Sequence, residues 1–268
     1  VRLPPERLPE IASQPDVISI SPYEEAQMHD ERQDQIIAGN LSGPAPSGPG
    51  YLAWLAGKGF TQEQFTATGF VVDLTDSGID NGTVTPGHLG LNVAGNPAQG
   101  SRVVYNRVEG TPHAGSTTAG YDGHGNLNAH ILGGFNDAAG GFPHADAAGF
   151  RYGLGVCPFV KLGSSVVFDP DTFTSPNYAN LQSRAYQDGA RISANSWGMT
   201  NNSYTVDAQA YDALVRDAQP EGSTFAAPGN QEMVIVFAAG NRGTNLNTVG
   251  APGTAKNVIT VGAAENVR

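Results

Sequence analysis

Three polar residues carry the side chains that acyl transfer requires. Asp76 follows an apolar run, His124 lies between two glycines, and Asn241 follows an Ala-Ala-Gly segment. In acyl transfer an imidazole takes a proton from the nucleophile, and a carboxylate holds that imidazole in the correct tautomer. An amide N–H stabilises the oxyanion that forms in the transition state. We therefore consider Asp76 as an orienting acid, His124 as a general base and Asn241 as an oxyanion donor.

From residue 51 onward, apolar runs alternate with helical segments. We expect strands near residues 70–75, 159–168, 191–195, 233–239 and 258–261, and helices near residues 51–58, 123–134, 180–188 and 208–218. Continuous apolar strands that alternate with helices are typical of a mostly parallel sheet covered by helices on both faces. Ligands of such sheets bind beyond the carboxyl ends of the strands. The pattern predicts an α/β fold, with Asp76 and Asn241 at that edge of the sheet.

The composition favours a globular domain and excludes some partners. The 268 residues include 35 glycines and are 39% hydrophobic, which suits a turn-rich chain with a sizeable core. Because 25 acidic residues stand against 14 basic ones, the net charge is −11. Binding to nucleic-acid phosphates requires clustered Lys and Arg, so we expect no nucleic-acid partner. No run approaches the roughly 18 apolar residues of a membrane span, so we expect no membrane partner either.

Several segments resemble, in the same order, the motifs of the subtilisin-like serine peptidases, or subtilases. They are Asp76–Asp80 (Asp-Ser-Gly-Ile-Asp), Gly123–Gly125, Ser193–Gly198 (Ser-Ala-Asn-Ser-Trp-Gly), Phe237–Gly243 (Phe-Ala-Ala-Gly-Asn-Arg-Gly), Val249–Gly253 and Val258–Ala263. The resemblance implies a three-layer subtilisin-like fold. It also implies a secreted serine endopeptidase whose triad includes Asp76 and His124, with Asn241 in the oxyanion hole and no cofactor for the chemistry.

The resemblance further implies where a polypeptide substrate binds. An extended substrate would pair with the backbone of residues 193–198, which also form a wall of the primary pocket. The implied substrate-binding residues are Ser193, Ala194, Asn195, Ser196, Trp197, Gly198, Ala239 and Gly240. For Trp197, a place in the hydrophobic core is an equally open interpretation.

The histidine motif departs from the family pattern. The family usually has threonine, histidine, valine and glycine where this chain has Asn126, Leu127, Asn128 and His130. His130 is therefore a second candidate for the catalytic imidazole. We favour His124 because it alone is followed by glycine, and we expect His130 to pack within its helix.

The Gly-Thr-Ser nucleophile motif of the family does not occur in the 268 residues, and neither Ser116 nor Ser223 has the right setting. We expect the nucleophile beyond Arg268, so the fragment alone is predicted to be inactive. The alternative is a non-catalytic subtilisin-like fold that serves as a binding or structural module. An acyl hydrolase of another α/β fold would need a Gly-x-Ser-x-Gly elbow, which is absent. The acid-acting sedolisin relatives would need a glutamate and an aspartate in place of His124 and Asn241.

The first 40 residues differ in character from the rest. Residues 3–22 resemble the last helix and strand of the subtilase propeptide, including a Pro-Asp-Val-Ile-Ser-Ile-Ser-Pro run. We therefore divide the chain into residues 1–40, a propeptide tail or N-terminal arm with its linker, and residues 41–268, an incomplete peptidase domain. Its own propeptide is then an expected partner.

Other residues have less specific interpretations. No His or Cys pair has metal-ligand spacing, so no metal ligand is assigned. Structural calcium is a weaker expectation, with oxygen ligands available from Asn136, Asp137 and Asp146 in a glycine-rich loop. Asp73, inside an apolar strand, is expected to be a buried hydrogen-bond partner. Cys157 is the only cysteine and is expected to act as a small hydrophobic residue.

Overall fold

The computed structural model describes residues 4–15, 17, 30–136, 145–243 and 245–263. Its centre is a six-stranded sheet with the order β4-β5-β3-β6-β7-β8, in which every neighbouring pair is parallel. The strands are β3 (Val71–Asp76), β4 (Val103–Val108), β5 (Lys161–Val166), β6 (Ala190–Asn195), β7 (Val234–Ala238) and β8 (Ile259–Val261). The predicted parallel α/β sheet is confirmed.

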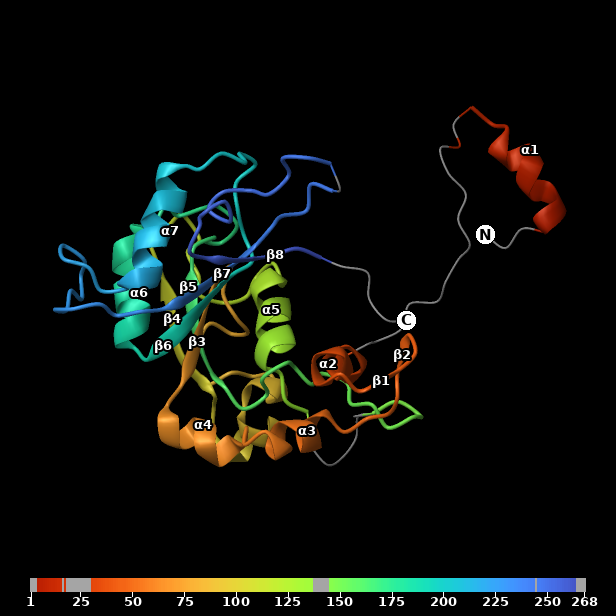
Figure 1. Ribbon diagram of the computed structural model, residues 1–268, viewed down its shortest axis with the longest axis horizontal. Coiled ribbons are helices and arrows are strands. Elements are labelled where there is room, and N and C mark those ends of the chain that lie inside the picture. The colour runs from red at the N-terminus through yellow and green to blue at the C-terminus, as the bar shows by residue number, and fades with distance from the viewer. Residues whose placement is uncertain (1–3, 16, 18–29, 137–144, 244, 264–268) are drawn as a thin grey trace.

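Helices cover both faces of the sheet, which gives three layers (Figure 1). The helices are α1 (Leu8–Ala12), α2 (Asp30–Ala38), α3 (Tyr51–Gly57), α4 (Gln62–Thr68), α5 (His124–Gly133), α6 (Tyr178–Gln187) and α7 (Val206–Arg216). Helices α6 and α7 lie on one face and α5 on the other, while α3 and α4 lie at the amino ends of the strands (Figure 1). Within the described ranges, none of these helices combines the length and apolar character that crossing a membrane demands.

The alternation of β3 decides which residues face α5. Val71 packs in the hydrophobic cluster under α6 and α7, whereas Val72 and Leu74 pack in the cluster that includes Ala129 of α5. Successive side chains of a strand point to opposite faces. Asp76 therefore shares the α5 face with Val72 and Leu74, and Asp73 faces the opposite layer.

Part of the α5 face of the sheet is uncovered in the described structure. The strand register places Val236 beside Ile259 and Ala238 beside Val261, so these side chains continue the apolar row of Val72 and Leu74 across β7 and β8. Yet the exposed fraction is 54% for both Ile259 and Val261. Residues Leu127, Ile131 and Val234 are also exposed on the α5 side. We call these five exposed residues, Leu127, Ile131, Val234, Ile259 and Val261, the open apolar strip.

A buried arginine anchors the C-terminal end of α5. The guanidinium of Arg102 donates hydrogen bonds to the carbonyl oxygens of Gly90, Asn92, Gly133 and Val160. Arg102 is only 1% exposed, so these carbonyls replace the water that the cation would otherwise bind. Gly133 is the last residue of α5, and the cation also complements the negative end of the helix dipole.

The N-terminal 40 residues are described only in part. Helix α1 has no buried residue, and nearly all of the strand expected before Pro22 lies outside the described residues. Helix α2 packs on the main body, because Glu31 accepts hydrogen bonds from the backbone N–H groups of Gly50, Tyr51 and Arg151. The small hairpin β1 (Leu41–Ser42) and β2 (Ala45–Pro46) follows it. The division at residue 40 stays a prediction.

Candidate active site

The end of β3 and the start of α5 bring Asp76 and His124 together. Asp76 is the last residue of β3, and His124 is the first residue of α5. The Nδ1 atom of His124 lies 2.7 Å from Oδ1 of Asp76. A carboxylate only accepts hydrogen bonds, so Nδ1 carries the proton and Nε2 of the neutral ring has the free lone pair. That tautomer is the one in which an imidazole can act as a base through Nε2.

The two partners differ in exposure. The side chain of Asp76 is 4% exposed, whereas that of His124 is 52% exposed. The backbone N–H of Ser77 donates to Oδ1 of Asp76 at 2.8 Å, and Nδ2 of Asn128 donates to Oδ2 at 2.9 Å. The acid is thus held inside the protein, while the base reaches solvent.

Glycines on both sides allow this close approach. A Cβ atom on Gly125 would lie 2.1 Å from the carbonyl oxygen of Gly78, which no side chain tolerates. Gly78 itself has φ of 94°, a conformation that favours glycine. The glycines that flank the acid and the imidazole in the sequence therefore let the first turn of α5 contact the loop after β3.

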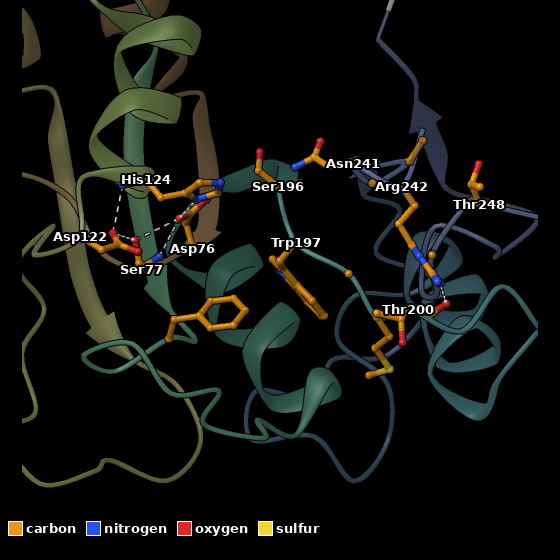
Figure 2. A pocket seen from close by; sticks show the side chains of 17 residues that line it. Asp76, Ser77, Asp122, His124, Ser196, Trp197, Thr200, Asn241, Arg242 and Thr248 are labelled. Atoms are coloured by element: carbon orange, nitrogen blue, oxygen red, sulfur yellow. Dashed lines mark hydrogen bonds and ion pairs between the residues drawn. The ribbon is translucent and has the colours of Figure 1, made fainter. Parts of the chain in front are cut away.

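A cavity of about 400 Å³ opens beside the pair, and Asp76, His124 and Asn241 all line it. Figure 2 shows the amide of Asn241 on the opposite side of the cavity from His124, directed toward it, with Ser196 between them. The three candidate residues come from segments that are far apart in the sequence. The structure places all three at the carboxyl edge of the sheet.

Only part of the predicted substrate-binding segment reaches this cavity. Ser196, Trp197, Gly198, Ala239 and Gly240 line it. In contrast, residues 193–195 belong to β6, which pairs with β3 on one side and β7 on the other. The prediction that a substrate strand pairs with Ser193, Ala194 and Asn195 therefore requires correction, because both edges of their strand are occupied.

Trp197 fits both interpretations of its role. Its ring packs against Phe173 and Phe237, with centroids 5.5 and 5.3 Å away, and the residue is 8% exposed. It also forms part of the cavity wall (Figure 2). It is a core residue with one face on the cavity.

Several residues of the site were not predicted from the sequence. The hydroxyl of Ser77 donates to Oδ1 of Asp122 at 2.5 Å, and Asp122 also accepts the backbone N–H of His124 at 3.0 Å. Arg242 lines the cavity and donates to the carbonyl oxygen of Thr200. For Asp122 the available signal was its place two residues before His124. For Arg242 the available signal was its place directly after Asn241 in a motif, and nothing in the sequence marked Thr200.

His130, the second candidate imidazole, faces away from Asp76. Its Nε2 lies 2.8 Å from Nδ1 of His88, and its Nδ1 lies 2.8 Å from the carbonyl oxygen of Asn126. Burial lowers the pKa of His130, against the opposing effect of the Asn126 carbonyl. It does not line the cavity. The structure therefore gives His130 a packing position.

The loop proposed for calcium offers poor ligands in its described part. The amide of Asn136 donates to the carbonyl oxygen of Tyr152. Asp137 lies outside the described residues. Asp146 pairs with Arg32 and accepts the backbone N–H groups of its own loop at Ala148 and Phe150. Because both carboxylate oxygens of Asp146 already have partners, Asp146 is not free to bind a cation here, and calcium binding stays a prediction.

Comparisons with known proteins were made for sequence and for structure. The model of the subtilase family matches residues 67–267. No curated protein matches the chain. Among solved structures, the CspB protease of Clostridium perfringens is 14% identical with a TM-score of 0.43 and coverage of 69% of this chain and 38% of that one. The subtilisin-like protease Apa1 of the Antarctic Pseudoalteromonas sp. AS-11 is 17% identical with a TM-score of 0.44, over 78% of this chain and 38% of that one.

Fervidolysin of Fervidobacterium pennivorans, described as a keratinolytic enzyme related to subtilisin, is 20% identical with a TM-score of 0.40. The match covers 74% of this chain and 25% of fervidolysin. The chain thus spans well under two thirds of the length of these solved structures. The family match extends over most of the chain and includes Asp76, His124 and Asn241. The chain belongs to the subtilase family.

Proposed function

We propose that this chain is part of a serine endopeptidase. His124 acts as the general base, Asp76 orients it, and Asn241 stabilises the oxyanion. The nucleophilic serine lies outside the 268 residues, in a longer parent chain. The observation that carries the proposal is the 2.7 Å contact of Nδ1 of His124 with Oδ1 of Asp76, at the wall of a cavity that Asn241 also lines.

The free nitrogen of His124 supports a nucleophile from another segment. Among the described residues, the hydrogen bonds and close polar contacts of His124 involve its backbone N–H and Nδ1, and no serine hydroxyl contacts Nε2. The ring is half exposed at the cavity. Its geometry suits a base that receives the proton of a hydroxyl supplied beside it.

The open apolar strip supports the same conclusion. It comprises exposed residues of α5 and of the neighbouring strands β7 and β8, on the sheet face that carries Asp76. Complete burial of a Val, Leu or Ile side chain stabilises a protein by roughly 1.5–3 kcal/mol. A further helix packed over β7 and β8 would bury this strip, and its end would lie at the edge of the sheet near His124. We infer that the segment with the serine covers it.

The proposed substrate is a polypeptide in an extended conformation. The backbone of residues 196–198, beyond the end of β6, is the part of the predicted segment that lines the cavity. Trp197 and Ala239 would border one substrate side chain. By family resemblance we also propose secretion, and that residues 1–40 include the tail of the enzyme's own propeptide.

The test is to express the longer parent chain and react it with a fluorophosphonate serine probe. We expect labelling at one serine outside residues 1–268, and loss of labelling in His124→Gln. His130→Gln is the matched control and should keep the label, because His130 lies outside the cavity. A folded parent that takes no label, or labelling that persists in His124→Gln, would instead support a binding module.

A further inference from the structure

We propose that Asn128 is a positioning residue for the pair formed by Asp76 and His124. This inference rests on the proposed function, because it gives Asn128 a role in orienting the general base. Asn128 stands where a valine is usual in the family motif, so the role does not follow from the family resemblance. Its amide contacts the acid of the pair and is absent from the cavity wall.

The helix places the amide over the carboxylate. His124 and Asn128 are four residues apart in α5 and therefore lie on the same side of the helix. Nδ2 of Asn128 lies 2.9 Å from Oδ2 of Asp76. The reverse orientation of the amide would set its carbonyl oxygen against a carboxylate oxygen. The NH₂ group must therefore be the side that faces Asp76.

The two oxygen atoms of Asp76 have different partners. Oδ1 receives Nδ1 of His124 and the backbone N–H of Ser77. For Oδ2, Asn128 is the only hydrogen-bond donor among the described residues. Because the Asp76 side chain is 4% exposed, water has little access to replace a lost donor. Removal of the amide would leave a buried carboxylate oxygen unsatisfied, which is costly.

Bonds at both oxygens fix the plane of the carboxylate. With Oδ2 held by Asn128, rotation about the Cβ–Cγ bond is restrained, so Oδ1 stays directed at Nδ1 of His124. Nδ2 of Asn128 also lies 3.3 Å from Nδ1 of His124. One of its two protons is directed to Oδ2 of Asp76, and Nδ1 carries the proton that it donates to Asp76, so it has no lone pair to accept the other. Asn128 thus acts on the imidazole through Asp76.

The test uses the parent chain with Asn128→Leu, which keeps the shape of the side chain and removes the donor. Asn128→Ala is a second variant in case the larger apolar group impairs folding. Asn96→Leu is the matched control, because Asn96 is exposed and its side chain accepts a single hydrogen bond among the described residues, from the N–H of Ala98. The first measurement is the low-field proton resonance of His124 Nδ1–H, which requires no serine.

We expect to observe the resonance of His124 Nδ1–H in the parent and in Asn96→Leu. In both Asn128 variants this proton should exchange with solvent at least about 10-fold faster, or its signal should be lost. In the active parent, kcat should fall about 10-fold while KM changes less than about two-fold. An unchanged resonance in folded Asn128 variants would overturn the proposal. If the parent takes no serine probe, the proposed function fails, and the proton measurement still decides the role of Asn128.

Discussion

Two aspartates of β3, three residues apart, have opposite surroundings. Asp73 faces the α6 layer and is fully buried; its oxygens accept the hydroxyl groups of Thr75, Tyr105 and Ser165 at 2.6–2.9 Å. Asp76 faces α5, and its partner His124 extends into a cavity. The first carboxylate is enclosed by a network that ends inside the protein. The carboxylate of Asp76 instead orients the imidazole of His124, which solvent and substrate can reach.

The charge around Asp73 is balanced internally. Burial raises the pKa of Asp73, while the nearby guanidinium of Arg184 lowers it. Arg184 also pairs with Glu109 and with Asp188. A buried acid alone is therefore no sign of chemistry. What distinguishes Asp76 is a titratable partner on an accessible surface.

The same contrast occurs on α5. His124 at its first residue faces Asp76 and the cavity, whereas His130 faces His88 and the carbonyl oxygen of Asn126. Strand β3 thus carries two aspartates and helix α5 carries two histidines. In each pair one side chain is enclosed and the other lines the cavity.

The largest expected effect is a loss of catalytic activity, which should occur on substitution of Asp76 and not of Asp73. In the parent, Asp76→Asn should lower kcat by about 10⁴, because the amide no longer holds the imidazole in the correct tautomer. The measurement is peptide hydrolysis under saturating substrate, with the melting temperature recorded for the same sample. Asp73→Asn should keep most of the activity in the molecules that remain folded. Equal losses of kcat in the two variants would erase the distinction.

The next effect concerns stability, and here the larger loss is expected at Asp73 and not at Asp76. Asp73→Leu should reduce the free energy of unfolding by about 3–5 kcal/mol, because Arg184 loses a buried counter-charge and three hydroxyl groups lose their acceptor. Urea denaturation measures this change. Asp73→Asn, which retains an acceptor oxygen, should cost less. A fully stable Asp73→Leu protein would show that the network contributes nothing.

The smallest effect concerns pH and sharpens the contrast on α5. Burial holds the pKa of His130 below its ordinary value of 6.5, so the folded chain binds this proton less readily than the unfolded chain. The stability that depends on neutral His130 is complete above about pH 6.5 and is lost as the pH falls through the folded pKa.

His130→Gln should therefore flatten the loss of stability between about pH 7 and pH 5, by roughly 1 kcal/mol or less. Urea midpoints at several pH values, compared with those of the unaltered protein, measure it. Parallel curves for the two proteins would contradict a buried neutral imidazole.

Apolar continuity explains which elements could be predicted. Strands β3, β5, β6, β7 and β8 were all expected from apolar runs. Strand β4 was missed because it lies at the edge of the sheet, alternates in burial and contains Asn106 and Arg107. Helices α2 and α4 were missed because their sequences are mostly polar.

The site residues that belong to sequence motifs could be predicted. Those that matter because of contacts between distant elements could not. Asp76, His124 and Asn241 follow from motif residues at the ends of elements. The contact of Asn128 with Asp76 depends on how the first turn of α5 meets the end of β3, which no local pattern contains. That both edges of β6 are paired could likewise not be predicted from the sequence, because strand order in a sheet is a property of the whole chain.

The cation at the far end of α5 affects how that helix moves. Arg102 binds Gly133 of α5 and, at the same time, Gly90, Asn92 and Val160 outside it, so the last turn cannot separate from these segments without breaking a charge-assisted bond to a buried cation. Helix ends ordinarily fray. Here the bond to Arg102 opposes fraying at the C-terminal turn, so α5 is held at both ends, by the buried cation at Gly133 and by the contact of His124 with Asp76 at its first turn.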